Sequence, residues 1–456
     1  MSSSCTTLEG PRPAETAPPV AAKAARSASL RWNFSWTFVG NIIYSGCQWA
    51  MLVVLAKLGN PEMVGQYGLA LAVATPILAL SSLQLRAVLT TDVTERIPFG
   101  EYLGFRLTTT VLSLVAIAMA PFVMHYRGDA TAVIWVIGIA QAIEMLSDLY
   151  WARMQFHDHM DRIATSMMAR GVLGLAALGA GVFLTHRVLW GAVGLMVARG
   201  AVLIGYDIRK QTQLAPQGAA EKETREAMQG GYAALRPHWT VPAQLQLLRT
   251  AITLGVIAML VSLLPNMPRY FIAHSLGERA LGIFTATAFL VSTGNLIIIA
   301  MGTAAFVRLA KHYGAGEKSQ FNSLLLKLLG IGGVLGIGGV IFAALFGHLL
   351  LRVLYRPEYA EHTDLLVAMM VSGAIGYVGT LLGSAVTAAR FFKAQIPVLA
   401  TAVGAAALSS WILVGSRGLL GAAYAAIITS VVLCLGQGIV VFFALRKMNR
   451  PAVVAS

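Results

Sequence analysis

Two acidic residues lie within a strongly apolar stretch of the chain, and their spacing suits proton or cation chemistry. In QAIEMLSDLYWARMQ, Gln141, Glu144 and Asp148 are three and four residues apart, so a helix would place them on one face. Two nearby carboxylates repel each other, and one of them could then carry a coupling proton or cation. The alternative is a structural ion pair with an arginine, for which the candidates are Arg153, Arg170 and Arg86.

Arginines near the ends of other apolar stretches could bind an anion. Arg86 lies in SSLQLRAVLTTD, Arg31 precedes the first apolar stretch, and Arg249 and Arg269 flank a later one. An arginine stays protonated and presents a planar set of donors that matches two phosphate oxygens. Two ordinary roles remain open: Arg86 could extend its charge to the membrane surface, and Arg269, one turn after Asn266, could be a loop residue.

Uncharged polar residues recur along the first apolar stretch, WNFSWTFVGNIIYSGCQWAML. Their spacings of four, four, three and four place them on one helical face: Asn33, Thr37, Asn41, Tyr44 and Gln48. Single residues of this kind can join helices through hydrogen bonds. A continuous stripe indicates a helix that faces water for most of its length, so we predict that this helix lines a hydrated cavity.

The elements that carry these residues are predicted to be membrane-spanning helices. The 456-residue chain is 57% hydrophobic and 12% charged, against about 25% charged residues in a soluble globular protein. A span needs about 20 mostly apolar residues. This criterion predicts an all-α polytopic membrane protein with twelve spans, near 36–57, 64–86, 104–124, 130–151, 166–186, 188–207, 247–268, 281–306, 324–350, 365–389, 395–414 and 418–444.

The basic residues predict that both termini are cytoplasmic. Of the 34 Lys and Arg residues, 26 fall on the tails and even-to-odd loops or their flanks in that orientation, and eight do not. The net charge of +14 then reflects topology and anionic lipid, and no nucleic-acid partner is implied. Residues 1–30 are read as a disordered cytoplasmic tail rather than a signal peptide, because the next apolar stretch has full spanning length.

A polar segment divides the spans into two groups of six. We predict an N-terminal six-helix lobe at 31–207, a cytoplasmic linker at 208–246, a C-terminal six-helix lobe at 247–446 and a cytoplasmic tail at 447–456. KLGNPEMVGQYGLALA in the first half is similar to SLGERALGIFTATA in the second. Such internal repeats are typical of secondary transporters, whose substrate path lies between the halves. The three cysteines show no paired spacing, so neither a disulfide framework nor a metal site is expected.

Four segments taken in order resemble a known family: LGNPEMVGQYGLALAVATP, SLQLRAVLTTD, QAIEMLSDLYWARMQFHDHMDRIATSMMARG and RYFIAHSLGERALGIFTATA. They are similar to Wzx-type polysaccharide flippases of the multidrug/oligosaccharidyl-lipid/polysaccharide (MOP) exporter superfamily, over residues 30–447. The resemblance implies a two-lobed, MATE-like transporter in the bacterial inner membrane that moves a polyprenyl-pyrophosphate-linked glycan to the outer leaflet. It also implies membrane lipid as a partner, with a polysaccharide polymerase or export machinery as a further one, and no cofactor.

The charged and polar residues described above could bind such a lipid-linked glycan. Arg31, Arg86 and Arg249 would attract the pyrophosphate at the cytoplasmic mouth. Sugar hydroxyls bind side chains that both donate and accept hydrogen bonds, so we expect Asn41, Tyr44 and Gln48 to contact the glycan. Asn266 and Arg269 are further predicted substrate contacts. Glu144 and Asp148 are candidates for ion coupling.

Two other functions remain open at this point. A cation-coupled multidrug exporter of the same fold would use a carboxylate deep in the amino-terminal lobe. A membrane enzyme acting on lipid-linked glycans would need a motif for nucleophilic or metal chemistry, and the sequence shows none. We therefore expect a transporter rather than an enzyme.

Overall fold

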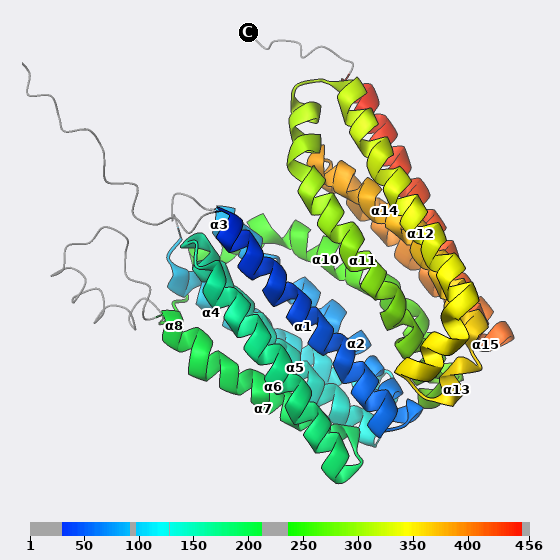
Figure 1. Ribbon diagram of the computed structural model, residues 1–456. Coiled ribbons are helices and arrows are strands. Elements are labelled where there is room, and N and C mark those ends of the chain that lie inside the picture. The colour runs from blue at the N-terminus through cyan, green and yellow to red at the C-terminus, as the bar shows by residue number, and fades with distance from the viewer. Residues whose placement is uncertain (1–29, 92–96, 127, 212–235, 449–456) are drawn as a thin grey trace, which may run out of the picture.

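The fold is an assembly of long helices in two lobes (Figure 1). A computed structural model of the chain describes residues 30–91, 97–126, 128–211 and 236–448. The first lobe contains α1 (Leu30–Leu58), α2 (Pro61–Ser82), α3 (Leu85–Thr91), α4 (Phe99–Val123), α5 (Asp129–Phe156), α6 (Met160–Thr185), α7 (Val188–Val202), the π-helix η1 (Leu203–Ile208) and α8 (Arg209–Gln211). The second contains α10 (Val241–Ser275), α11 (Gly277–Gly314), α12 (Lys318–Leu354), α13 (Pro357–Ala360), α14 (Thr363–Ala388) and α15 (Phe392–Met448).

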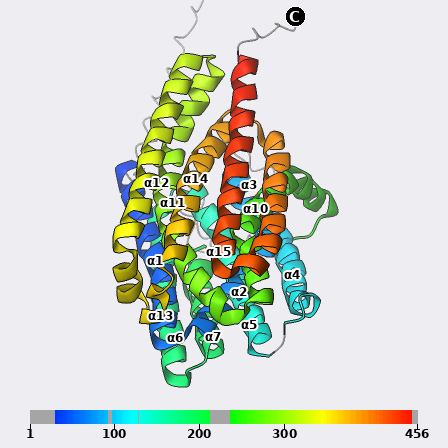
Figure 2. The same cartoon turned by 90° about the vertical axis from the view of Figure 1, so that its right-hand side faces the viewer.

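Within the described ranges, eleven helices are long and apolar enough to cross a membrane. The last, α15, has 57 residues and would extend about 85 Å at 1.5 Å per residue, nearly three times the bilayer core. Its backbone leaves the helical region at Gly418, with φ of 60° and ψ of −136°. Figure 2 shows the red part of α15 running back beside the orange part, so α15 supplies two spans and the prediction of about twelve is confirmed.

The segment between the lobes differs from the predicted linker at both ends. Helix continues beyond residue 207 to Gln211, and α10 begins at Val241 rather than at 247. The start of α10 is fixed against α4, because Glu101 accepts hydrogen bonds from the backbone of Thr240 at 3.1 Å and from the side chain of Gln244 at 3.1 Å. The predicted tails, residues 1–29 and 449–456, lie outside the described residues.

The lobes meet at one end and diverge towards the end from which the C-terminus leaves (Figure 1). At the closed end, α2 and α11 approach so closely that glycine is required. A Cβ added at Gly65 would collide with the backbone carbonyl of Glu278, and one added at Gly282 would collide with the carbonyl of Pro61. One hydrophobic core runs across both lobes here, with Val64 and Tyr67 of α2 packed in the same cluster as Phe284 of α11.

Charged side chains surround this glycine contact. Arg279 of α11 lies 2.7 Å from Glu358 and 3.7 Å from Glu62 of α2, and Gln66 donates to Glu278 at 2.8 Å. Arg356 also donates to the backbone carbonyl of Lys57, at 3.0 Å. The closed end therefore combines close backbone packing with polar links between the lobes.

Candidate functional site

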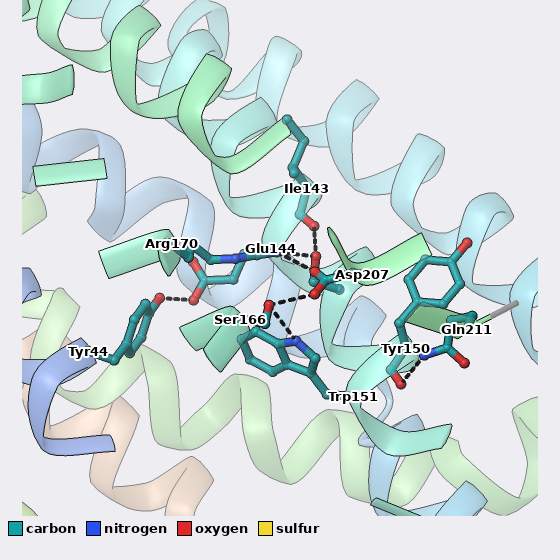
Figure 3. A network of polar contacts seen from close by, with 10 residues as sticks. Tyr44, Ile143, Glu144, Tyr150, Trp151, Ser166, Arg170, Asp207 and Gln211 are labelled. Atoms are coloured by element: carbon teal, nitrogen blue, oxygen red, sulfur yellow. Dashed lines mark hydrogen bonds and ion pairs between the residues drawn. The ribbon is translucent and has the colours of Figure 1, made fainter. Parts of the chain in front are cut away.

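The C-terminal end of the polar stripe on α1, at Tyr44 and Gln48, contacts α5. The hydroxyl of Tyr44 donates to the carboxylate of Glu144 (Figure 3). Gln48 donates to the Tyr44 oxygen at 2.8 Å. Nearer the start of the helix, Asn41 is exposed and donates to the backbone carbonyl of Thr37 at 2.8 Å. The stripe thus ends in a hydrogen-bond network with Glu144, and its water-facing role stays a prediction.

Glu144 forms an ion pair with an arginine of α7. Arg199 is 2% exposed, its Nη1 lies 2.9 Å from Glu144, and it also donates to Gln141. The sequence reading that proposed an ion pair for Glu144 named three other arginines, so the structure supplies a different partner. A buried arginine costs free energy when it has no partner. Because both acceptors of Arg199 lie on α5, these contacts hold α7 against α5.

Asp148, one turn further along α5, pairs with Arg86. The Arg86 Nη1 lies 3.0 Å from Asp148, while Nε and Nη2 donate to Gln155 at 3.0 and 2.8 Å. Both side chains of this pair are 35% exposed. The ion-pair alternative is therefore confirmed for Asp148, with Arg86 as its partner, and this pair stays accessible to a solute.

An unusual turn places Arg86. Leu83 and Gln84 both have left-handed backbone angles, with φ of 49° and 51°. Each such residue costs about 1–2 kcal/mol when it is not glycine. The turn ends α2 and starts α3 at Leu85, so that Arg86 faces α5. Local strain that orients a charged residue is a common feature of functional sites.

Arg106 of α4 is a further buried cation beside this group. It is 1% exposed, its Nη1 donates to the Ser82 carbonyl at 3.2 Å, and its Nε has no hydrogen-bond partner in the described part of the chain. Among the described residues it forms no salt bridge, although the Asp148 carboxylate interacts with it electrostatically. Arg106 therefore contributes positive charge without a direct ion pair to any described carboxylate.

A fully buried ion pair lies behind these residues (Figure 3). Arg170 of α6 lies 2.7 Å from Asp207, and both side chains are 0% exposed. Asp207 belongs to the π-helix η1, and it accepts a hydrogen bond from Ser166. The Arg170 guanidinium also lies 5.2 Å from the centroid of the Trp151 ring. π-helical segments occur often at functional sites because they redirect a side chain.

These charges surround a pocket of about 390 Å³, called here the N-lobe pocket. Glu144, Asp148 and Trp151 of α5 line it, and Ser262 of α10 closes it from the second lobe. The complete lining is Thr75, Leu78, Ala79, Ser82, Gln141, Glu144, Met145, Asp148, Trp151 and Ser262. Four arginines (Arg86, Arg106, Arg170 and Arg199) and three carboxylates (Glu144, Asp148 and Asp207) thus lie in or directly behind its wall.

Asn266 and Arg269 lie next to this pocket rather than in a loop. Helix α10 continues to Ser275, so the expectation that Arg269 is an ordinary loop arginine is wrong. Arg269 is 9% exposed and donates to Asn266 at 2.9 Å; Asn266 in turn donates to Thr75, a lining residue, at 3.3 Å. Arg269 forms no ion pair with any described residue, so it adds a second buried cation without a carboxylate.

The structure does not bring all predicted residues together. Arg31 lies in α1, but its side chain is outside the described part of the structure. Arg249 is exposed on α10, and its neighbours Leu247 and Ala251 pack on the other face of that helix. The roles predicted for these two arginines stay predictions.

Sequence reasoning missed Arg106, Arg199 and Asp207 as members of the site. A usable signal existed, because each lies inside a predicted apolar span and charged residues in spans are costly unless paired or hydrated. The partner of each charge could not be read from spacing, because the pairs join different helices.

No family model matches the chain. A capsular polysaccharide biosynthesis protein, CapF of Staphylococcus aureus, is 23% identical over 393 residues, which cover 86% of this chain and 94% of CapF. The chain is therefore similar over nearly its whole described length to a protein named for polysaccharide biosynthesis.

Solved structures give the fold. The inward-facing conformation of a multidrug resistance MATE family transporter of the MOP superfamily matches with a TM-score of 0.69 and 13% identity, covering 90% of this chain and 98% of that one. An outward-facing conformation of a MATE family transporter matches with a TM-score of 0.58 and 13% identity, covering 91% and 94%. This chain is a multi-pass membrane protein that has the fold of the MATE transporters of the MOP superfamily.

Proposed function

We propose that the chain is a flippase that moves a polyprenyl-pyrophosphate-linked oligosaccharide across the bacterial inner membrane for polysaccharide biosynthesis. The observation that carries this proposal is the excess of arginine around the N-lobe pocket. Four arginines face three carboxylates there, and Arg106 has no ion-pair partner among the described residues. A pyrophosphate brings several negative charges, and buried arginines are well suited to bind it.

Accessibility decides which arginine meets the substrate first. Arg86 and Asp148 are both partly exposed, so a phosphate oxygen could take the place of the Asp148 carboxylate on the Arg86 guanidinium. Arg199 and Arg170 are held in buried ion pairs, so they would act on the substrate through their electrostatic potential rather than by direct contact. Asp148, once released, would be free to accept a proton, which links substrate binding to ion coupling.

The remaining predicted residues have proposed places in the same cycle. Arg31 and Arg249 would attract the pyrophosphate at the cytoplasmic mouth, and Asn41, Tyr44 and Gln48 would meet the sugars. Both termini would be cytoplasmic. The higher TM-score with the inward-facing relative supports a conformation open towards the cytoplasm at the end where the lobes diverge.

A cation-coupled multidrug exporter is the second candidate. It is favoured by Glu144 and Asp148, which line the N-lobe pocket and could bind a cationic drug or a coupling ion. Their ion pairs with Arg199 and Arg86 reduce the negative charge available to such a ligand. The flippase therefore accounts better for the charges of this pocket, and the similarity to CapF supports it. We propose a transporter without enzymatic activity, working beside a polymerase or export machinery.

Deletion of the gene in the organism that encodes the chain would test the proposal. The flippase predicts that lipid-linked oligosaccharide accumulates with its sugars protected from a membrane-impermeant glycosidase added to spheroplasts. Re-expression of the wild-type chain should restore cleavage. If the lipid-linked sugars are distributed as in the parent strain while efflux of cationic dyes is lost, the drug exporter is supported instead.

A further inference from the structure

The C-terminal lobe contains a second cavity that the charged site does not include. This C-lobe cavity has a volume of about 520 Å³ and lies among α10, α11, α14 and α15. Its lining consists of Ile257, Val261, Leu264, Gly302, Thr303, Phe306, Gly379, Thr380, Gly383, Ser384, Thr387, Gln395, Leu399, Leu433 and Gln437. None of these lining residues is charged, in contrast to the N-lobe pocket.

The hydroxyl groups in the lining offer acceptors rather than donors. Thr303, Thr380, Ser384 and Thr387 each donate to the backbone carbonyl four residues earlier, at 2.9 to 3.1 Å. Their protons are therefore committed within their own helices, while at least one lone pair on each oxygen remains available; Thr387 already accepts from Gln395. A ligand that brings its own hydroxyl donors would complete these interactions.

One buried amide in the lining has an unmet hydrogen bond. Gln437 is 4% exposed, and its Oε1 has no hydrogen-bond partner in the described chain. The other glutamine of the lining, Gln395, uses its amide nitrogen to donate to Thr387 at 2.8 Å. Gly383, opposite the Gln437 amide, leaves the space that a side chain would fill. A buried polar atom without a partner costs free energy unless water or a ligand satisfies it.

Size and lining together indicate the class of ligand. The volume falls within the roughly 300–1,000 Å³ range of small-molecule pockets, and it is far larger than an ion held by oxygens at about 2.3–2.6 Å would need. The absence of charge in the lining argues against a phosphate group. Apolar walls that include Phe306 and Leu433 provide surfaces for the C–H face of a ring.

We propose that the C-lobe cavity binds an uncharged, hydroxyl-rich sugar residue of the transported glycan, with Gln437 as its central hydrogen-bond partner. This inference rests on the proposed flippase function and extends it. The N-lobe pocket binds the pyrophosphate, and the C-lobe cavity selects the sugar. The two lobes thus recognise different parts of one substrate, the pyrophosphate and the sugar.

Binding of two defined probes to the full chain in nanodiscs tests this assignment. The probes are undecaprenyl pyrophosphate alone and undecaprenyl pyrophosphate carrying a disaccharide of N-acetylglucosamine, measured by thermophoresis. We expect the wild type to bind the sugar-bearing probe more tightly. Gln437→Met, which keeps the size and removes the amide, should reduce that preference by roughly tenfold, as expected for the loss of one good hydrogen bond. Affinity for the sugar-free probe should stay within twofold.

Two further variants keep the test decisive. Ser384→Ala removes one acceptor of the lining and should also reduce the preference if Gln437→Met fails to fold. Thr429→Val is the matched control, because Thr429 is buried on the same helix, donates only to its own backbone and lies outside the lining. It should leave both affinities unchanged.

The outcomes separate the two proposals. An equal loss of affinity for both probes in Gln437→Met, or no preference for sugar in the wild type, would overturn the sugar site. Sodium-dependent thermal stabilisation that Gln437→Met abolishes without changing sugar preference would also overturn it, in favour of a cation site. Failure of the wild type to bind either probe would instead count against the flippase function itself.

Discussion

At the residue scale, the chemistry of the N-lobe pocket depends on which arginines are already neutralised. Arg199 and Arg170 are held in buried pairs, and Arg86 is paired but accessible. Arg106 and Arg269 are buried and form no ion pair within the described ranges. Desolvation makes a buried unpaired arginine costly in the resting protein. A polyanionic substrate would supply the missing negative charge. We therefore expect its most favourable contacts to be near Arg106 and Arg269.

Arg86→Gln should reduce glycan export at least tenfold while protein levels in the membrane stay unchanged. The variant keeps hydrogen-bonding capacity and removes the charge, and a charge-assisted contact is worth roughly 1.5–3 kcal/mol. Export can be followed by surface polysaccharide in a strain that lacks the chromosomal gene. Arg187→Gln is the control, because Arg187 lies 3.9 Å from Asp129 in an exposed pair and such pairs contribute little. Equal effects of the two substitutions would contradict a specific role for Arg86.

Arg170→Met should destabilise the protein strongly, because it leaves Asp207 buried without a positive charge to pair with, although Ser166 still donates a hydrogen bond to it. Breaking a buried pair in this way typically costs 3–5 kcal/mol. The double variant Arg170→Met, Asp207→Leu should recover most of the loss, since no lone charge then remains. Melting of the purified variants in detergent measures both effects. A double variant as unstable as the single one would show that the pair stabilises by packing rather than by charge.

At the element scale, the contact between α2 and α11 helps to hold the lobes together at their closed end. It depends on the absence of side chains at Gly65 and Gly282, and it is bordered by the Arg279 ion pairs. Packed helix contacts of this kind separate as a unit rather than stretching gradually. Opening this end would therefore require loss of the whole contact.

Gly282→Val should open the closed end. A Cβ at this position collides with the Pro61 carbonyl, so the helices must separate. In a background where the three native cysteines are serine, we expect a cysteine at Thr285, 0% exposed in the structure, to react with a membrane-impermeant maleimide only when Gly282→Val is present. Gly338→Val is the control, because nothing lies within 4 Å of a Cβ there. Labelling that is unaffected by Gly282→Val would show that this contact does not seal the end.

The helices themselves could be predicted well from the sequence. In a bilayer every backbone polar group must be satisfied within the helix, so spanning length and hydropathy predict where the helices lie. The break between residues 414 and 418 corresponds to Gly418 in α15. The ends were less predictable. Polar residues near the membrane surface continue the helix, which is why α10 runs to Ser275 and includes Arg269.

The pairing of charges could not be predicted in the same way. Spacing of three and four residues placed Glu144 and Asp148 on one face, and both do line the N-lobe pocket. It could not identify Arg199, which approaches Glu144 from another helix, nor the turn at Leu83 and Gln84 that directs Arg86. These features arise from packing between helices, and one sequence holds no direct record of that packing.

At the scale of the whole molecule, the two lobes differ in their chemistry. The first carries a charged pocket and the second an uncharged cavity, and the lobes meet at one end (Figure 1). If the lobes closed in turn at one end and then at the other, the N-lobe pocket and the C-lobe cavity would be exposed first to one side of the membrane and then to the other. A substrate with an anionic group joined to neutral sugars fits this division better than a cationic drug.

Transbilayer movement of a lipid-linked glycan in reconstituted vesicles tests the central claim most directly. The purified chain is placed in vesicles that contain undecaprenyl-pyrophosphate oligosaccharide, and cleavage by an external glycosidase reports movement between leaflets. We expect the wild type to make nearly all of the glycan accessible and Arg86→Gln to slow this at least tenfold. Protein-free vesicles should leave about half of the glycan protected. Protection that stays at one half with the wild-type protein, with and without proton or sodium gradients, would contradict the claim.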